Sequence, residues 1–251
     1  ELYNNVSELQ KKYASKEFLD GLKKLSIPKD NFPDFKLISK ELFNASKWEL
    51  ISVAGFLTEE LFFDLNSQRK FPVTDIIRKS PRFDEKYHEE DIVNDEGYTP
   101  EPDIFHDVQG HIPLLSNREY SNFLHKVGIL GDKIIKNELG LSKDLIDHNL
   151  KRLQNFAWWT YEFGLLKKQN VNTDNDIDYE IYGSGILSSQ SEILNIVNCA
   201  KNKSYQSVFL PYDIDEIVLT SFNYSNIQDS YYVIDSMNSL YQSFDDNQHL
   251  F

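Results

Sequence analysis

The chain has 251 residues, 40% of them hydrophobic and 14% aromatic, so it suits one large domain or two small ones with ample material for a core. Its formal net charge is −14. No basic stripe is present, which excludes an ordinary nucleic-acid binder and weighs against an anionic membrane surface.

Cysteine usage and hydropathy restrict the compartment. The single cysteine, Cys199, excludes an internal disulfide, nearly excludes a cysteine-based metal site and indicates a reducing environment. No apolar run approaches the ~20 residues that a membrane span requires, and the polar N-terminal segment lacks the apolar core of a signal peptide. We therefore expect a cytoplasmic protein without nucleic-acid or membrane partners.

The predicted elements are mostly helices. Apolar residues at helical spacing predict a helix over residues 1–25 and another over 35–43. Alternation predicts a short strand over 48–54, and Thr58 followed by acids predicts a capped helix. The remaining elements are an extended stretch at 71–78, a polar loop at 79–101, helices over 102–109, 117–128, 142–166 and 187–199, a turn at 181–185, a strand over 230–235 and a helix over 236–244. No repeat or domain boundary stands out, so the predicted fold class is mainly α with a few short β-strands.

The densest chemistry lies in PEPDIFHDVQGHIPLL, residues 100–115. Pro102 and Asp103 suit a helix start, whereas Gly110 is predicted to end the helix and Pro113 to block its continuation. Two histidines five positions apart diverge by about 140° on an ideal α-helix. A break at Gly110 is therefore expected to turn the second histidine back toward the first.

A third group is needed to define a metal site. Glu162 lies in NFAWWTYEFGL, where an isolated buried carboxylate would be costly without a partner. Two histidines, His106 and His111, with one carboxylate and open positions form the facial triad of non-haem Fe(II) oxygenases. The residues alone leave two alternatives: hydrogen-bonded core histidines with Glu162 paired to Arg or Lys, or a zinc hydrolase.

The flanking residues carry a family resemblance. PDIFHDVQGHIPLL closely resembles the iron-binding signature of the biopterin-dependent aromatic amino acid hydroxylases, and WWTYEFGL resembles the segment that carries their glutamate ligand. IYGSGILSSQSE, SVAGFLTEELFF, FPVTDIIRK and YYVIDSMNSL resemble further segments of the family, in the same order, from about residue 8 to 244. The resemblance implies one compact catalytic domain, a monomer, without the N-terminal regulatory domain and the C-terminal tetramerisation tail.

The same resemblance implies the residues of the metal and pterin sites. The iron ligands would be His106, His111 and Glu162, and Ser188 would supply a hydroxyl that hydrogen-bonds a ligand histidine. The pterin would stack on Phe62, with Asp107 nearby. Its ring would bind along a backbone edge formed by Gly55, Phe56, Leu57 and Thr58. Two of these assignments have simpler alternatives, namely that Phe62 is plain core and that Ser188 is a helix cap.

Other residues are implied for the amino acid substrate. Arg78 would bind its carboxylate as a bidentate fork, although a surface ion pair with the acids at 84–96 is the alternative. The pocket would be lined by Thr99, Trp158, Phe163 and Gly185. Trp158 has packing alone as its alternative. Three features depart from the family's pattern: a long segment at 79–97, Ala157 in place of a tyrosine, and Tyr224 in place of a small apolar residue or an acid.

The function that follows is hydroxylation of the ring of a free aromatic amino acid by dioxygen. It requires Fe(II) and tetrahydrobiopterin or a related tetrahydropterin as co-substrate. Phenylalanine, converted to tyrosine, is the expected substrate. Tyrosine is the first alternative, and Trp158 argues against tryptophan because tryptophan hydroxylases usually carry Phe there. A zinc hydrolase and a non-catalytic binder are the alternatives from other classes.

Overall fold

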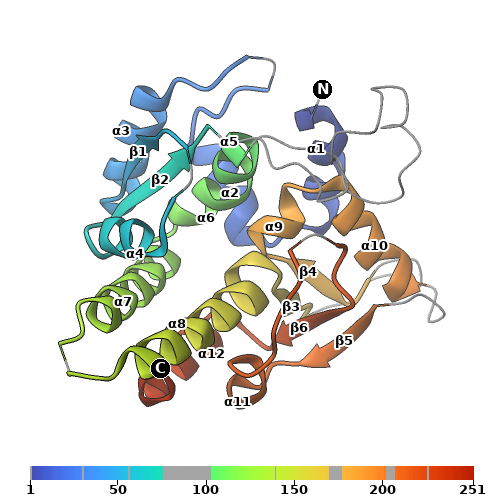
Figure 1. Ribbon diagram of the computed structural model, residues 1–251. Coiled ribbons are helices and arrows are strands. Elements are labelled where there is room, and N and C mark those ends of the chain that lie inside the picture. The colour runs from blue at the N-terminus through green and yellow to red at the C-terminus, as the bar shows by residue number, and fades with distance from the viewer. Residues whose placement is uncertain are drawn as a thin grey trace, which may run out of the picture.

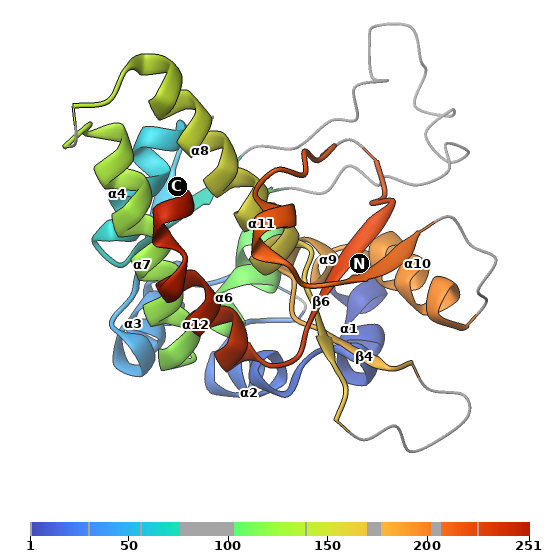
Figure 2. The ribbon, with the colours of Figure 1, turned by 90° about the horizontal axis from the view of Figure 1, so that it is seen from below.

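The structure is a computed structural model that describes residues 2–29, 31–55, 57–75, 103–138, 140–169, 177–201, 207–224 and 226–251. Helices make up most of these residues, and the strands are short, as predicted. Figures 1 and 2 place α3 (Phe35–Ser46), α4 (Glu59–Ser67) and α7 (Arg118–Ile135) on one side of the molecule. A small sheet and α10 (Gln190–Lys201) lie on the other side.

The N-terminal segment forms two helices, α1 (Leu2–Tyr13) and α2 (Lys16–Lys24), so the prediction of one helix over 1–25 was wrong. The break has a tertiary cause. Ala14 pairs with Ile181 as an isolated bridge, and the Ser15 N–H donates to the Ile181 carbonyl at 2.8 Å. The Ser15 side chain then caps α2 by accepting from the Phe18 N–H.

A strand–helix–strand unit follows α3. Strands β1 (Glu49–Val53) and β2 (Lys70–Thr74) pair in parallel, with α4 between them in the chain. The predicted cap is confirmed, because the Thr58 side chain accepts from the Leu61 N–H and acids occupy the first turn of the helix. This unit contacts α7 through α4.

The centre of the chain contains two π-helical turns. After α5 (Asp103–Phe105), the turn η2 (His106–His111) leads directly into α6 (Ile112–Leu115). Helix α8 (Lys143–Ala157) continues as the turn η3 (Trp158–Glu162). The predicted helix over 142–166 is therefore too long, because Leu165 already begins a strand.

The second sheet has the order β4–β3–β6–β5 and anchors the C-terminal half. Strand β3 (Leu165–Lys167) pairs antiparallel with β4 (Tyr179–Ile181) and parallel with β6 (Ser230–Ile234), which pairs parallel with β5 (Val208–Pro211). The predicted strand at 230–235 and the helix after it are confirmed. The helices of this half are α9 (Ser184–Leu187), α10, α11 (Ile214–Ile217) and α12 (Met237–Asp246), followed by the short η4 (Gln248–Leu250).

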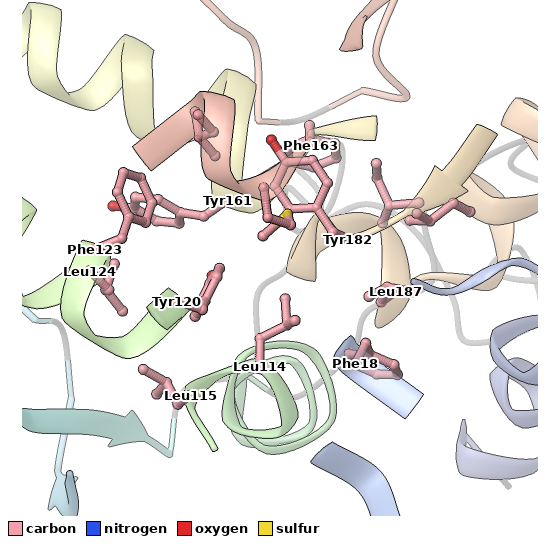
Figure 3. Packing of buried hydrophobic residues seen from close by; sticks show 14 of the residues in the cluster. Phe18, Leu114, Leu115, Tyr120, Phe123, Leu124, Tyr161, Phe163, Tyr182 and Leu187 are labelled. Atoms are coloured by element: carbon pink, nitrogen blue, oxygen red, sulfur yellow. The ribbon is translucent and has the colours of Figure 1, made fainter. Parts of the chain in front are cut away.

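Buried side chains from both halves meet in one cluster. Figure 3 shows Leu114 of α6 and Tyr120 of α7 facing Tyr182 and Phe163, with Phe18 of α2 beside them. Packing of this kind fixes the relative positions of the π-helical turns. Among the residues that the structure describes, no helix combines the length and the apolar character needed to cross a bilayer.

Candidate metal centre and its surroundings

The two histidines are brought together by a π-helical turn. The Ile112 N–H donates to the Asp107 carbonyl, five residues back, so residues five apart lie on nearly the same side. The Nε2 atoms of His106 and His111 are 3.0 Å apart. The expected helix end at Gly110 was wrong: the helix runs on, and Pro113 lies at the start of α6.

Gly110 has a different role from the one predicted. A Cβ built there would lie 2.6 Å from the Ser184 carbonyl oxygen, so only glycine allows η2 to pack this closely on α9. At the N-cap of α9, a Cβ at Gly183 would lie 2.5 Å from the Glu162 carbonyl oxygen. These two close approaches hold both ligand-bearing segments against one turn.

Glu162 is carried by the second π-helical turn. The Phe163 N–H donates to the Trp158 carbonyl, again five residues back, at 2.9 Å. The Glu162 Oε1 lies 3.1 Å from His111 Nε2, and its Oε2 lies 3.5 Å from His106 Nε2. Within the described part of the chain this is the one group of His, Cys, Asp or Glu whose ligand atoms gather in this way, all within 4.8 Å.

The spacing of these atoms fits a single divalent ion. Ligand atoms about 2.1 Å from an ion and at right angles to each other would be about 3 Å apart. The three separations of 3.0, 3.1 and 3.5 Å are close to this value. An imidazole pair with a carboxylate is also a donor set that suits iron.

The electrostatics favour an ionised carboxylate. Burial works to raise the pKa of Glu162, but the charges of His111 and His106 and the hydrogen bonds from His111 and Ser184 lower the pKa to about 2. The carboxyl group is therefore deprotonated throughout the physiological range, as a metal ligand must be.

Ser188 lies where a histidine-orienting hydroxyl is needed. Its Oγ is 2.9 Å from His106 Nδ1, and its hydroxyl also lies 2.9 Å from the Ser184 carbonyl oxygen. If the ring carries its proton on Nδ1, His106 donates to Ser188, which donates in turn to Ser184. The lone pair of Nε2 then faces the other two ligand atoms.

Ser184 is a residue that the sequence reasoning missed. Its Oγ lies 2.9 Å from Glu162 Oε2, 3.1 Å from His111 Nε2 and 2.9 Å from the Tyr161 carbonyl oxygen. The available signal was its place between two glycines in IYGSG, since a buried hydroxyl in such a turn must find partners.

The residues predicted for the pterin lie on or next to η2, β1 and α4. Gly55 has a positive φ of 80° and donates its N–H to Asp75 Oδ1 at 2.9 Å. Asp107 accepts from the Thr74 N–H at 2.9 Å and so ties η2 to the end of β2. Phe62 is half-buried and meets Phe63 edge to face. Of the other predicted residues, Thr58 is exposed, Leu57 is half-buried and Phe56 lies outside the described residues.

Part of the predicted substrate wall is assembled. Trp158 stacks on Phe163, with the two ring centroids 4.6 Å apart. It also stacks on Phe222, with ring centroids 4.2 Å apart and an interplanar angle of 8°. Gly185 packs against the same wall, because a Cβ there would lie 2.8 Å from the Phe163 ring. Arg78, Thr99 and the segment at 79–97 lie outside the described residues, whereas Ala157 is half-buried and Tyr224 is exposed.

Comparison with known proteins gives a consistent result. The family model described as biopterin-dependent aromatic amino acid hydroxylase matches residues 1–248. The phenylalanine-4-hydroxylase of Chromobacterium violaceum is 32% identical over 242 residues, which cover 96% of this chain and 70% of the relative. That of Vibrio cholerae is 31% identical, with 96% of this chain and 71% of the relative covered.

A solved structure of the Chromobacterium violaceum phenylalanine hydroxylase, with bound iron(III) and 7,8-dihydrobiopterin, superposes with a TM-score of 0.75 at 31% identity. The superposition covers 99% of this chain and 78% of the other. The match in sequence extends over nearly the whole chain, including both histidines and the glutamate that meet in the structure. The chain therefore belongs to the family of biopterin-dependent aromatic amino acid hydroxylases.

Proposed function

We propose that this protein is an iron(II)- and tetrahydropterin-dependent monooxygenase that converts free phenylalanine to tyrosine. The observation that carries the proposal is the group formed by His106, His111 and Glu162, whose spacing suits one metal ion. The printed names of the relatives support phenylalanine as substrate, and a relative's structure with iron and dihydrobiopterin supports both cofactors.

In this proposal the three side chains hold the iron, with His106 oriented by Ser188. The chemistry that iron supplies when bound is the activation of dioxygen, with two electrons from the reduced pterin. The protein contributes pre-set ligands. Because Glu162 is already ionised, its carboxylate needs to lose no proton before metal can bind.

The aromatic wall has the task of keeping water from the reacting ring. The stacked rings of Phe163, Trp158 and Phe222 form an apolar wall against which another aromatic ring can pack. The bulk of Trp158 disfavours tryptophan as substrate, while tyrosine is the nearest competitor. We assign the substrate carboxylate to Arg78, whose fork-shaped guanidinium matches a carboxylate in two parallel hydrogen bonds, and we assign Thr99 to the rim of the pocket.

The pterin is assigned to the surface between β1 and α4. Phe62 would stack on its ring, the backbone of residues 55–58 would hydrogen-bond its edge, and Asp107 would lie close to it. The contact between Asp75 and the Gly55 N–H supports this assignment, since it fixes the backbone at the start of that edge.

A substrate panel tests the proposal. Protein loaded with Fe(II) is given tetrahydrobiopterin, dioxygen and phenylalanine, tyrosine or tryptophan, and the hydroxylated products are identified. Tyrosine formed from phenylalanine, dependent on both iron and pterin and lost in His106→Ala, is the expected result. Absence of any ring hydroxylation by the iron-loaded protein would overturn the proposal, and hydroxylation of tyrosine alone would correct its substrate.

A further inference from the structure

We propose that Gln228 is a positioning residue that sets the orientation of Trp158 and thereby helps to select the substrate. The inference rests on the proposed function, in which Trp158 forms a wall of the amino acid pocket. Gln228 lies between β5 and β6 in the chain, far in sequence from Trp158, and it is 4% exposed.

The side-chain amide of Gln228 has all of its donors engaged. Its Oε1 accepts from the indole Nε1–H of Trp158 at 3.0 Å. Its Nε2 donates to the carbonyls of Asn223 at 2.9 Å and Asn226 at 2.8 Å. An amide has two N–H groups, so both are used and the orientation of the amide is fixed by contacts other than Trp158.

The backbone of Gln228 is also held on both sides. Its N–H donates to Glu192 Oε1 at 3.3 Å, and its carbonyl accepts from Ser207 Oγ at 2.7 Å. Glu192 is 2% exposed and accepts a second hydrogen bond from the Tyr231 hydroxyl. Hydrogen bonds therefore hold the backbone of Gln228 against α10 and the sheet, and its Oε1 is a fixed acceptor for the indole N–H of Trp158.

Stacking alone does not determine how the indole lies. The rings of Phe163 and Phe222 on Trp158 restrict its tilt, but a flat ring between flat rings can still turn within its own plane. A directed N–H···O bond removes this freedom because it weakens steeply when bent. The amide also holds the carbonyl of Asn223, which directly follows Phe222, and so keeps that ring over the indole.

Loss of this acceptor changes the pocket wall rather than the chemistry. Gln228→Met keeps the approximate side-chain volume but removes the hydrogen bond to Trp158, together with the two donations to the carbonyls of Asn223 and Asn226. One neutral hydrogen bond corresponds to a factor of about 2 to 10 in an equilibrium constant. We therefore expect the KM for phenylalanine to rise about 3- to 10-fold, with the pterin KM unchanged and with tryptophan accepted relatively better.

A double-mutant cycle tests whether Gln228 acts through the indole. Trp158→Phe removes the N–H and keeps an aromatic ring, so adding Gln228→Met to it should raise the phenylalanine KM by a clearly smaller factor than in the wild-type background. Trp159→Phe is the matched background, since it removes a similar indole bond, to the Thr220 carbonyl at 2.8 Å. There Gln228→Met should keep its full effect.

Solvent protection of the Trp158 indole N–H, measured by NMR without substrate, gives a second test that needs no kinetics. In the same spectrum the indole N–H of Trp159, bonded to the Thr220 carbonyl, shows whether the variant is folded. In Gln228→Met the protection of Trp158 should be lost and that of Trp159 kept.

Equal effects of Gln228→Met in the Trp158→Phe and wild-type backgrounds would overturn the inference. So would a folded Gln228→Met variant in which the Trp158 indole N–H is still protected. In either case a wild-type protein that hydroxylates phenylalanine leaves the proposed function intact. A wild type that hydroxylates no aromatic amino acid overturns the proposed function itself, and with it the substrate-selecting role of Gln228.

Discussion

The buried carboxyl group of Glu192 makes the stability of the fold depend on pH. Burial raises its pKa to about 7 from a usual 4.5, and the hydrogen bonds from Tyr231 and Gln228 offset only part of that effect. The folded state thus favours the protonated form more than the unfolded state does. The stabilisation that this group provides is complete below pH 4.5 and is lost as the pH rises through about 7.

The size of the effect follows from the pKa difference. At about 1.36 kcal/mol per pH unit, a pKa raised from 4.5 to about 7 corresponds to about 3 kcal/mol. About three-quarters of it falls between pH 5 and pH 8. Glu192→Gln is neutral in both states at every pH. We therefore expect the free energy of unfolding of the variant minus that of wild type to be about 2 to 3 kcal/mol larger at pH 8 than at pH 5, which means that the variant becomes relatively more stable.

Urea denaturation of both proteins at the two pH values measures this difference. Other titrating groups affect both proteins alike and cancel when the two are compared. Glu49→Gln, at an exposed position of β1, serves as the matched control for the loss of a carboxylate. If the difference between Glu192→Gln and wild type is the same at pH 5 and pH 8, the carboxyl group does not titrate in this range and the reasoning fails.

The remaining predictions concern the proposed iron, pterin and substrate sites. Alanine at any of the three proposed metal ligands should abolish iron binding or activity with the circular dichroism spectrum retained, and full activity in one of them would remove it from the set. Ser188→Ala should weaken iron affinity about 10- to 100-fold in a chelator competition, because the orientation of His106 is then lost. Phe62→Ala should raise the pterin KM several-fold while the phenylalanine KM changes little. An unchanged pterin KM would mean that Phe62 packs in the core and does not contact the pterin. Arg78→Lys should lower kcat/KM for phenylalanine about 10- to 150-fold, and an equal loss with phenethylamine, which lacks the carboxylate, would contradict the assignment.

Local signals in the sequence predicted those parts of the fold that local chemistry determines. Thr58, followed by two acidic residues, predicted the start of α4, and the alternating pattern at 230–235 predicted β6. Both signals are local, because helix caps and strand alternation depend on neighbouring residues. The break between α1 and α2 depends instead on pairing of Ala14 with Ile181, which no local pattern reveals.

The candidate metal site was likewise predictable from the sequence only in part. The identities of the two histidines and the glutamate could be proposed from residue type and family resemblance. Their convergence was expected from a helix end at Gly110, whereas it comes from continued helix with a wider turn. No local pattern in the sequence indicates the roles of Ser184 and Gln228, because their partners lie far away in the chain: His111 is 73 positions from Ser184, and Trp158 is 70 positions from Gln228.

The two π-helical turns have a consequence for how the chain tolerates change in length. A π turn accommodates one residue more than the α-helical turn it replaces, so each ligand-bearing helix contains, in effect, a single inserted residue. Deleting one residue from η2 would let the helix return to ordinary α geometry with its hydrogen bonds intact. The two histidines would then be four positions apart and about 40° from each other around the helix axis, so they would still share one face. Keeping the five-residue spacing while the turn relaxed to α geometry would instead separate them by about 140°. The wider turn and the spacing of the two histidines are therefore matched, and a change in one requires a change in the other.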